Sequence, residues 1–161
     1  MRAAMAALGV WLAMGVAPGV VPGAAQAAPL PDGGLTADDV AAVMRSKGYQ
    51  TEIGVDSDGD PRVRSSANGA RFAIYFYECA KTPRCRSIQF TAGFAGSPIG
   101  DARVAEWNRT KRFGRAYLDK DGDPWVEMDV DAERGMTTEG LANQFDRWNA
   151  VMGSFMRYIG R

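Results

Sequence analysis

Asp56-Ser57-Asp58-Gly59-Asp60-Pro61 and Asp119-Lys120-Asp121-Gly122-Asp123-Pro124 are two copies of one pattern, Asp-x-Asp-Gly-Asp-Pro, and they set the layout of this 161-residue chain. Each copy lies between two short runs in which apolar and polar residues alternate. Asp-Gly between such runs favours a two-residue turn, because Gly readily accepts the positive φ that the turn needs. Pro can then begin the returning strand, where a ladder N–H is not required. The pattern therefore predicts two β-hairpins.

The same carboxylates also resemble a calcium-binding loop. An EF-hand loop needs Gly at its sixth position and a bidentate Glu at its twelfth. Here the sixth position holds Pro61 or Pro124, and the twelfth holds Ala67 or Val130. We therefore interpret the two segments as solvated turns and assign no metal ligand and no cofactor. A calcium- or ligand-responsive structural domain that uses the two Asp-rich turns remains the alternative.

The N-terminus has the features of an export signal. Met1-Arg2 precedes an apolar stretch that prolines and glycines interrupt, and Ala25-Gln26-Ala27 fits the small-x-small cleavage pattern. A membrane anchor is the weaker alternative, because the unbroken apolar run is shorter than the ~20 residues that a spanning helix needs. We predict a signal peptide over residues 1–27, a disordered leader over 28–34 and a single domain over 35–161. This predicts a periplasmic or secreted protein with no membrane span in the mature chain.

The composition limits the classes of function. Removal of residues 1–27 takes away Arg2 and no acid, which leaves 18 basic and 19 acidic residues. A nearly neutral chain has no bulk attraction to nucleic acid, so we expect no nucleic-acid partner. The chain has no histidine, which excludes Ser-His-Asp and Cys-His catalysis, and it has no phosphate-binding glycine loop. A hydrolase that uses carboxylates alone is a minor alternative. We predict a protein that is not an enzyme.

The two cysteines, Cys79 and Cys85, flank a short turn-like insert between two strand patterns. In an oxidising compartment, neighbouring cysteines pair more often than they stay free. We therefore predict a Cys79–Cys85 disulfide, which contributes about 2 kcal/mol to stability because the loop it closes is short.

Helix signals separate the strand patterns. Thr36 and Asp39 form a predicted capping box before a helix that ends at Lys47-Gly48. Ser97-Pro98 predicts the start of a second helix, which Gly114 ends. The last helix begins near Thr137. Its apolar residues follow a 4-3-4-3-4 spacing that predicts core packing or, alternatively, a seam for a second helix; they are Leu141, Phe145, Trp148, Met152, Phe155 and Ile159.

The resulting order, α-β-β-β-β-α-β-β-α, predicts an α+β domain in which helices pack on one face of an antiparallel sheet. Seven stretches in this order resemble the YbjN-domain family, whose label refers to bacterial sensory transduction regulation. They are Gly34–Val40, Asp56–Ser65, Phe72–Tyr77, Cys85–Phe90, Glu106–Asn108, Lys111–Tyr117 and Glu127–Val130.

The resemblance covers nearly all of the predicted mature chain. It implies a fold similar to that of type III secretion chaperones, a protein-binding habit and no catalytic residue. Those chaperones are typically cytoplasmic homodimers, whereas this chain carries a predicted export signal and disulfide. A homodimer is therefore one assembly that the resemblance suggests, and a protein partner of unknown identity is the other.

Strand alternation points to a binding surface. If Phe72, Ile74 and Phe76 face the helices, the residues between them face outward. The predicted outward face carries five candidate binding residues: Tyr75, Tyr77, Trp125, Arg62 and Arg64. Tyr, Trp and Arg are the side chains enriched at binding hot spots. Cross-strand pairing that only stabilises the sheet is the alternative. The sequence therefore predicts an exported protein-interaction module, chaperone-like or part of a regulatory pathway.

Overall fold

The computed structural model describes residues 27–79 and 83–161 of the chain, so most of the predicted signal peptide lies outside the described residues. The described elements follow the predicted order. They are α1 (Ala37–Ser46), β1 (Glu52–Val55), β2 (Pro61–Ala67), β3 (Ala70–Cys79), β4 (Cys85–Gly93), α2 (Gly100–Thr110), β5 (Arg115–Leu118), β6 (Pro124–Asp131) and α3 (Thr138–Tyr158).

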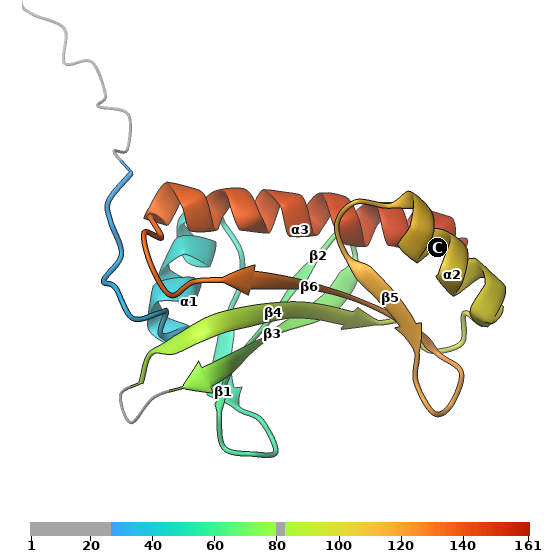
Figure 1. The fold of residues 1–161 in the computed structure, drawn as a ribbon, viewed down its shortest axis with the longest axis horizontal. Helices are drawn as coiled ribbons and strands as arrows, with labels where there is room; N and C mark the ends of the chain where they lie inside the picture. The colour runs from blue at the N-terminus through green and yellow to red at the C-terminus, as the bar shows by residue number, and fades with distance from the viewer. Residues whose placement is uncertain (1–26, 80–82) are drawn as a thin grey trace, which may run out of the picture.

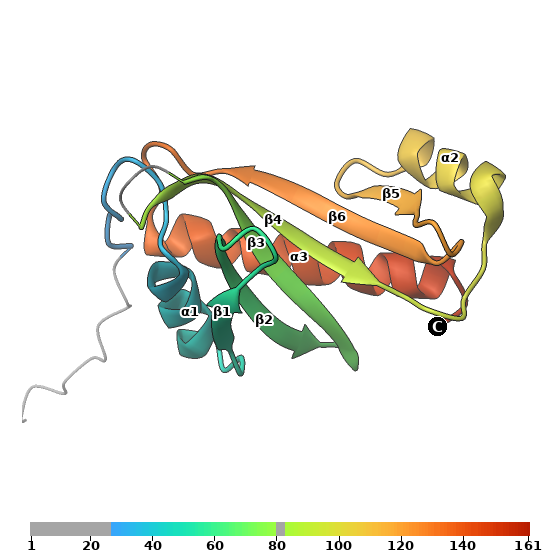
Figure 2. The same cartoon turned by 90° about the horizontal axis from the view of Figure 1, so that it is seen from below.

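The strands form one six-stranded sheet with the order β1-β2-β3-β4-β6-β5, and each neighbouring pair is antiparallel. Helices α1 and α3 lie on one side of the sheet, and α2 lies beside β5 at one end (Figure 1). Among the residues that the structure describes, no helix covers the opposite face, as the view from below shows (Figure 2). The predicted α+β fold is confirmed. No helix in the described ranges has both the length and the hydropathy to cross a bilayer.

Helix α3 supplies much of the core. Its predicted apolar stripe is buried against the sheet of the same chain: the Trp148 ring stacks on Phe90 at 5.6 Å between ring centroids, and the Phe155 ring meets Trp107 of α2 at 4.9 Å. The core-packing interpretation of the stripe is therefore confirmed. These side chains leave no apolar seam of α3 exposed for a second helix.

The helix starts agree with the sequence in two of three cases. Thr36 and Asp39 form the predicted capping box at α1, and Thr137 caps α3. Helix α2 begins later than predicted, with Ile99 before its first residue and no side-chain cap. The Ser97 hydroxyl accepts a hydrogen bond from Arg161 Nε, so it is engaged away from the helix start.

The segment 28–34, predicted as a disordered leader, is instead held against the connection between β6 and α3. Leu30 N donates to Met136 O at 2.8 Å, and Gly33 N donates to Glu133 O at 2.9 Å. Leu35, which follows, is completely buried. The segment therefore has hydrogen-bond partners that the local sequence did not reveal.

Cys79 and Cys85 form the predicted disulfide. They are cross-strand partners at the ends of β3 and β4, and Cys85 is buried. The bridge therefore joins two strands that are already neighbours in the sheet.

Both Asp-rich segments form hairpin turns, but each turn has three residues rather than the two predicted. Asp56 N donates to Asp60 O at 2.9 Å, and Asp119 N donates to Asp123 O at 3.0 Å. The carboxylate of the first Asp selects the longer turn, because its Oδ1 accepts from two backbone amides within the turn. Gly59 and Gly122 then take φ values of 89° and 80°, as this turn requires.

Candidate functional site

The strand register places the predicted binding residues on the open face of the sheet. Arg62 lies opposite Tyr75, and Tyr75 lies opposite Gln89. On the same strand, Ile74 and Phe76 are fully buried on the helix side. The outward set therefore shares one face across four strands, as period-two alternation predicts.

A groove of about 870 Å³ lies on this face. The base of the groove lies close to the sheet backbone, because three central residues, Ala73, Thr91 and Gly93, have small side chains or none. Larger side chains line the groove around them, among them Arg64, Arg71, Tyr75, Trp125 and the acidic Glu52. The hollow thus follows from small residues on the central strands and long or aromatic ones on either side.

Three of the five predicted binding residues line this groove: Arg64, Tyr75 and Trp125. Tyr77 and Arg62 share the open face but are not among the lining residues. Arg71, which the sequence reasoning missed, does line it. Its position two residues before Ala73 on β3 was the available signal, because alternation puts both on the outward face.

Trp125 is held in place without any ligand. Its indole Nε1 donates to Asp119 Oδ2 at 2.9 Å, and its ring stacks with Tyr117 at 6.3 Å and 13°. The ring also lies directly over Gly93, since a Cβ on that residue would be only 2.5 Å from the indole. The hydrogen bond from Trp125, followed by that from the Asp123 amide, lowers the pKa of Asp119. The carboxylate that orients the indole therefore stays ionised at neutral pH.

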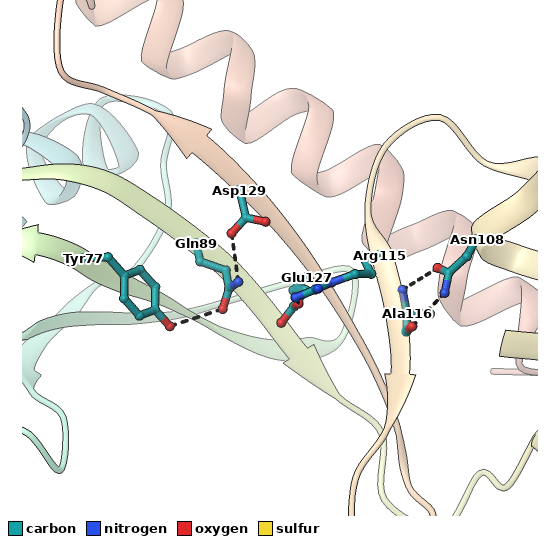
Figure 3. Close-up of polar contacts among 7 residues, drawn as sticks. All are labelled: Tyr77, Gln89, Asn108, Arg115, Ala116, Glu127 and Asp129. Carbon is teal, nitrogen blue, oxygen red and sulfur yellow. Dashed lines mark hydrogen bonds and ion pairs between the residues drawn. The ribbon is translucent and has the colours of Figure 1, made fainter. Parts of the chain in front are cut away.

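Tyr77 belongs to a chain of polar contacts beside the groove (Figure 3). Its hydroxyl donates to Gln89 Oε1 at 3.3 Å, and Gln89 Nε2 donates to Asp129 Oδ1 at 2.8 Å. Burial is the largest cause that raises the pKa of Tyr77, ahead of the nearby carboxylate of Glu127. The phenol thus stays protonated and acts as a hydrogen-bond donor.

One row of residues crosses all six strands and carries an ion pair at each end. Arg64 pairs with Glu52 at 3.7 Å at one end, and Arg115 pairs with Glu127 at the other (Figure 3). Glu127 is only 5% exposed although it lies on the open face. Its hydrogen bond raises the pKa of Arg115.

The sequence analysis did not identify Arg115 as the partner of Glu127. The signal was present in the spacing. In each hairpin, one member of the ion pair stands four positions before the first Asp of the turn, and the other stands four positions after the last Asp. Hairpin register could therefore have identified both ion pairs. It also shows that the acidic residue is on the first strand of one hairpin and on the second strand of the other.

The Asp-rich turns show no arrangement that is typical of a metal centre. Asp56 Oδ1 and Asp119 Oδ1 each accept two backbone hydrogen bonds within their own turn. Asp121 forms an ion pair with Lys120. Over residues 27–79 and 83–161, no three Cys, Asp or Glu side chains are grouped in a way that would hold a metal ion.

The fold and the groove define an α+β protein whose open sheet face carries a groove lined by aromatic and charged side chains. Residues 36–161 match the YbjN family model, described as "Putative bacterial sensory transduction regulator". The chain belongs to the YbjN family. A comparison with curated proteins finds none that matches significantly.

Proposed function

We propose that this protein is an exported regulatory module that binds a protein partner in the groove of its open sheet face, rather than an enzyme. The family description as a regulator supports the general class. The finer proposal, including export and the groove as the binding site, rests on the predicted signal peptide and on the geometry of the open face.

The observation that carries the proposal is the fixed position of Trp125. An aromatic side chain that is already oriented loses little conformational freedom when a partner packs on it. Trp125 has its indole N–H bound by Asp119 and its ring supported by Gly93, and it still lines an open groove. Arg64 and Arg71 line the same groove and can add directional hydrogen bonds.

The depth and composition of the groove suggest the kind of partner. Small residues on the floor leave room for side chains from a partner, while the aromatic walls bury apolar area. We propose that the partner presents an extended or partly unfolded segment, which is the form of binding that a chaperone-like protein would use.

The groove can be tested by replacing its aromatic residues. Trp125→Ala and Tyr75→Ala should each weaken partner capture from the native envelope fraction by roughly 30-fold or more, the effect of losing ~2 kcal/mol at a hot spot. Tyr77→Ala is the matched control, because Tyr77 lies on the same face but does not line the groove. Circular dichroism should show that all three variants are folded. Equal capture by wild type, Trp125→Ala and Tyr75→Ala would contradict the proposal.

Export requires a separate measurement. N-terminal sequencing of protein from the envelope fraction should begin at Ala28, after cleavage behind Ala27. Recovery of an intact chain that begins at Met1 in the cytoplasm would contradict export, but it would leave the groove proposal standing.

A further inference from the structure

A second hollow, of about 420 Å³, lies on the helix side of the molecule. Trp107 of α2, residues 111–113 of the α2–β5 connection and one side of α3 line it. Figure 1 shows this connection arching up to α3, away from the open sheet face. The hollow is therefore separate from the groove, and an inference from it does not depend on the proposed function.

Three cationic side chains gather around this hollow. The Arg147 guanidinium lies 4.7 Å from the centroid of the Phe113 ring, and the Arg112 guanidinium lies 5.9 Å from the same centroid. Lys111 Nζ lies 5.6 Å from the Trp107 ring centroid. No acidic residue is among the lining residues. Across the described ranges, none of the three cations takes part in an ion pair.

Local stabilisation explains only part of this cluster. Lys111 follows the C-terminus of α2, where a positive charge complements the helix dipole. Arg147 stands near the middle of α3, so the dipole of that helix does not account for its charge, although its Nη1 donates to Gln144 Oε1 at 2.7 Å. Contacts between a cation and an aromatic ring stabilise exposed sites only weakly. Bringing three like charges together opposes that gain unless an anion occupies the space between them.

The aromatic residues indicate what kind of anion would fit. Phe113 is 47% exposed, so much of its ring remains available, whereas the Trp107 indole behind it is buried and only borders the hollow. Rings of this kind stack on flat apolar groups, while guanidinium groups bind carboxylates through paired hydrogen bonds. The volume falls in the range of about 300–1,000 Å³ that is usual for small-molecule sites. Asn143 and Ser154 add uncharged hydrogen-bonding groups.

We propose that this hollow binds a small organic anion with a flat apolar body, of the aromatic carboxylate class. Lys111, Arg112 and Arg147 hold the carboxylate, and the exposed ring of Phe113 holds the flat body. An acidic peptide would use the same charges but would not need the Phe113 ring, so poly-glutamate and an aromatic carboxylate distinguish the two ligands, while the uncharged form of the aromatic probe tests the need for charge.

The test is a titration of the ¹⁵N-labelled full-length chain with 2-naphthoate, followed by amide chemical shifts. Saturable shifts should appear at residues 111–114 and 143–154, with a Kd below about 1 mM. The uncharged 2-naphthamide should bind at least ~10-fold more weakly, because it lacks the charge that the cations recognise. Added salt should weaken naphthoate binding, because it screens exposed charges.

The paired substitution Lys111→Gln/Arg112→Gln should weaken naphthoate binding at least ~10-fold and leave Arg147 in place on Phe113. Arg134→Gln, which removes an exposed charge from the β6–α3 connection, is the matched control and should bind as wild type. Scattered or unsaturable shifts, equal binding of the amide, or unchanged binding by the paired variant would each overturn the proposal. A tight response to poly-glutamate without a response to naphthoate would also overturn it, in favour of an acidic peptide.

Discussion

The two Asp-rich hairpins share a sequence pattern and a local structure, but their surroundings differ. Both close through a three-residue turn, and both carry a cross-strand ion pair at the same offset from it. In the β1–β2 hairpin both side chains of the ion pair are exposed to solvent, and Val55 is 60% exposed. In the β5–β6 hairpin, Asp119 holds Trp125 and Asp123 Oδ1 accepts from Gly96 N at 2.9 Å.

The repeated pattern therefore determines the turn but not its role. The local hydrogen bonds to the first Asp are the same in both copies, so they arise from the hexapeptide itself. The tertiary contacts of the second copy arise from residues outside it, above all Trp125 and Gly93. Substitutions can separate these two contributions.

The largest expected difference comes from placing a methyl group at a glycine beside each hairpin. Gly93→Ala would put Cβ within 2.5 Å of the Trp125 indole, so the ring must move and its bond to Asp119 is strained. We expect a loss of about 2 kcal/mol in the free energy of unfolding, which is typical of overpacking. Denaturant unfolding monitored by tryptophan fluorescence measures it.

Gly54→Ala is the matched substitution in the first hairpin. Its Cβ would meet only Arg62 Nη2, at 3.9 Å, which is an ordinary contact. The expected change is a gain of up to about 0.5 kcal/mol, because Ala has less freedom than Gly in the unfolded chain. If both variants lost the same stability, the two hairpins would not differ in the way described.

The turn glycines should instead respond alike. Gly59 and Gly122 both have positive φ, and a Cβ at either would meet nothing within 4 Å. Ala at each position is therefore opposed by backbone strain alone, which we estimate at about 1 kcal/mol. Thermal or denaturant unfolding of the two single variants measures this. A clear inequality between them would show that the turns are not locally equivalent.

The smallest expected effect is an acid dependence that belongs to the second hairpin. The hydrogen bond from Trp125 lowers the pKa of Asp119 in the folded protein. A lowered folded pKa adds stability that is present above the unfolded value of about 3.9 and is lost as the pH falls through the folded value. Below about pH 4, wild type should therefore lose stability more steeply than Asp119→Asn. Parallel pH profiles of the two proteins would contradict this assignment.

Local and periodic signals in the sequence were sufficient for much of the fold. The capping box at Thr36, the stripe on α3 and the Cys79–Cys85 pair each depend on residues close in sequence or on a regular spacing. The outward direction of Tyr75 and Trp125 also followed from alternation along single strands.

Features that depend on distant partners were missed. The leader is held by Met136 and Glu133, whose bonded partners Leu30 and Gly33 lie a hundred or more residues away in sequence. The groove depends on which small residues of β3 and β4 become neighbours, and this requires the register of the whole sheet. The turn length depended on a side chain, Asp56 or Asp119, competing for backbone amides, which a rule based only on Asp-Gly does not consider.

Asn108 of α2 has a consequence for assembly. Its Nδ2 donates to Ala116 O at 3.0 Å and its Oδ1 accepts from Ala116 N at 2.8 Å, so one amide side chain occupies the outer edge of β5 as a neighbouring strand would (Figure 3). Open-ended growth of a fibril by strand pairing needs two free edges on every molecule. Because this side chain already occupies the outward N–H and C=O of Ala116, a strand from another molecule has to displace it before pairing with β5, and this opposes growth through both edges of the sheet.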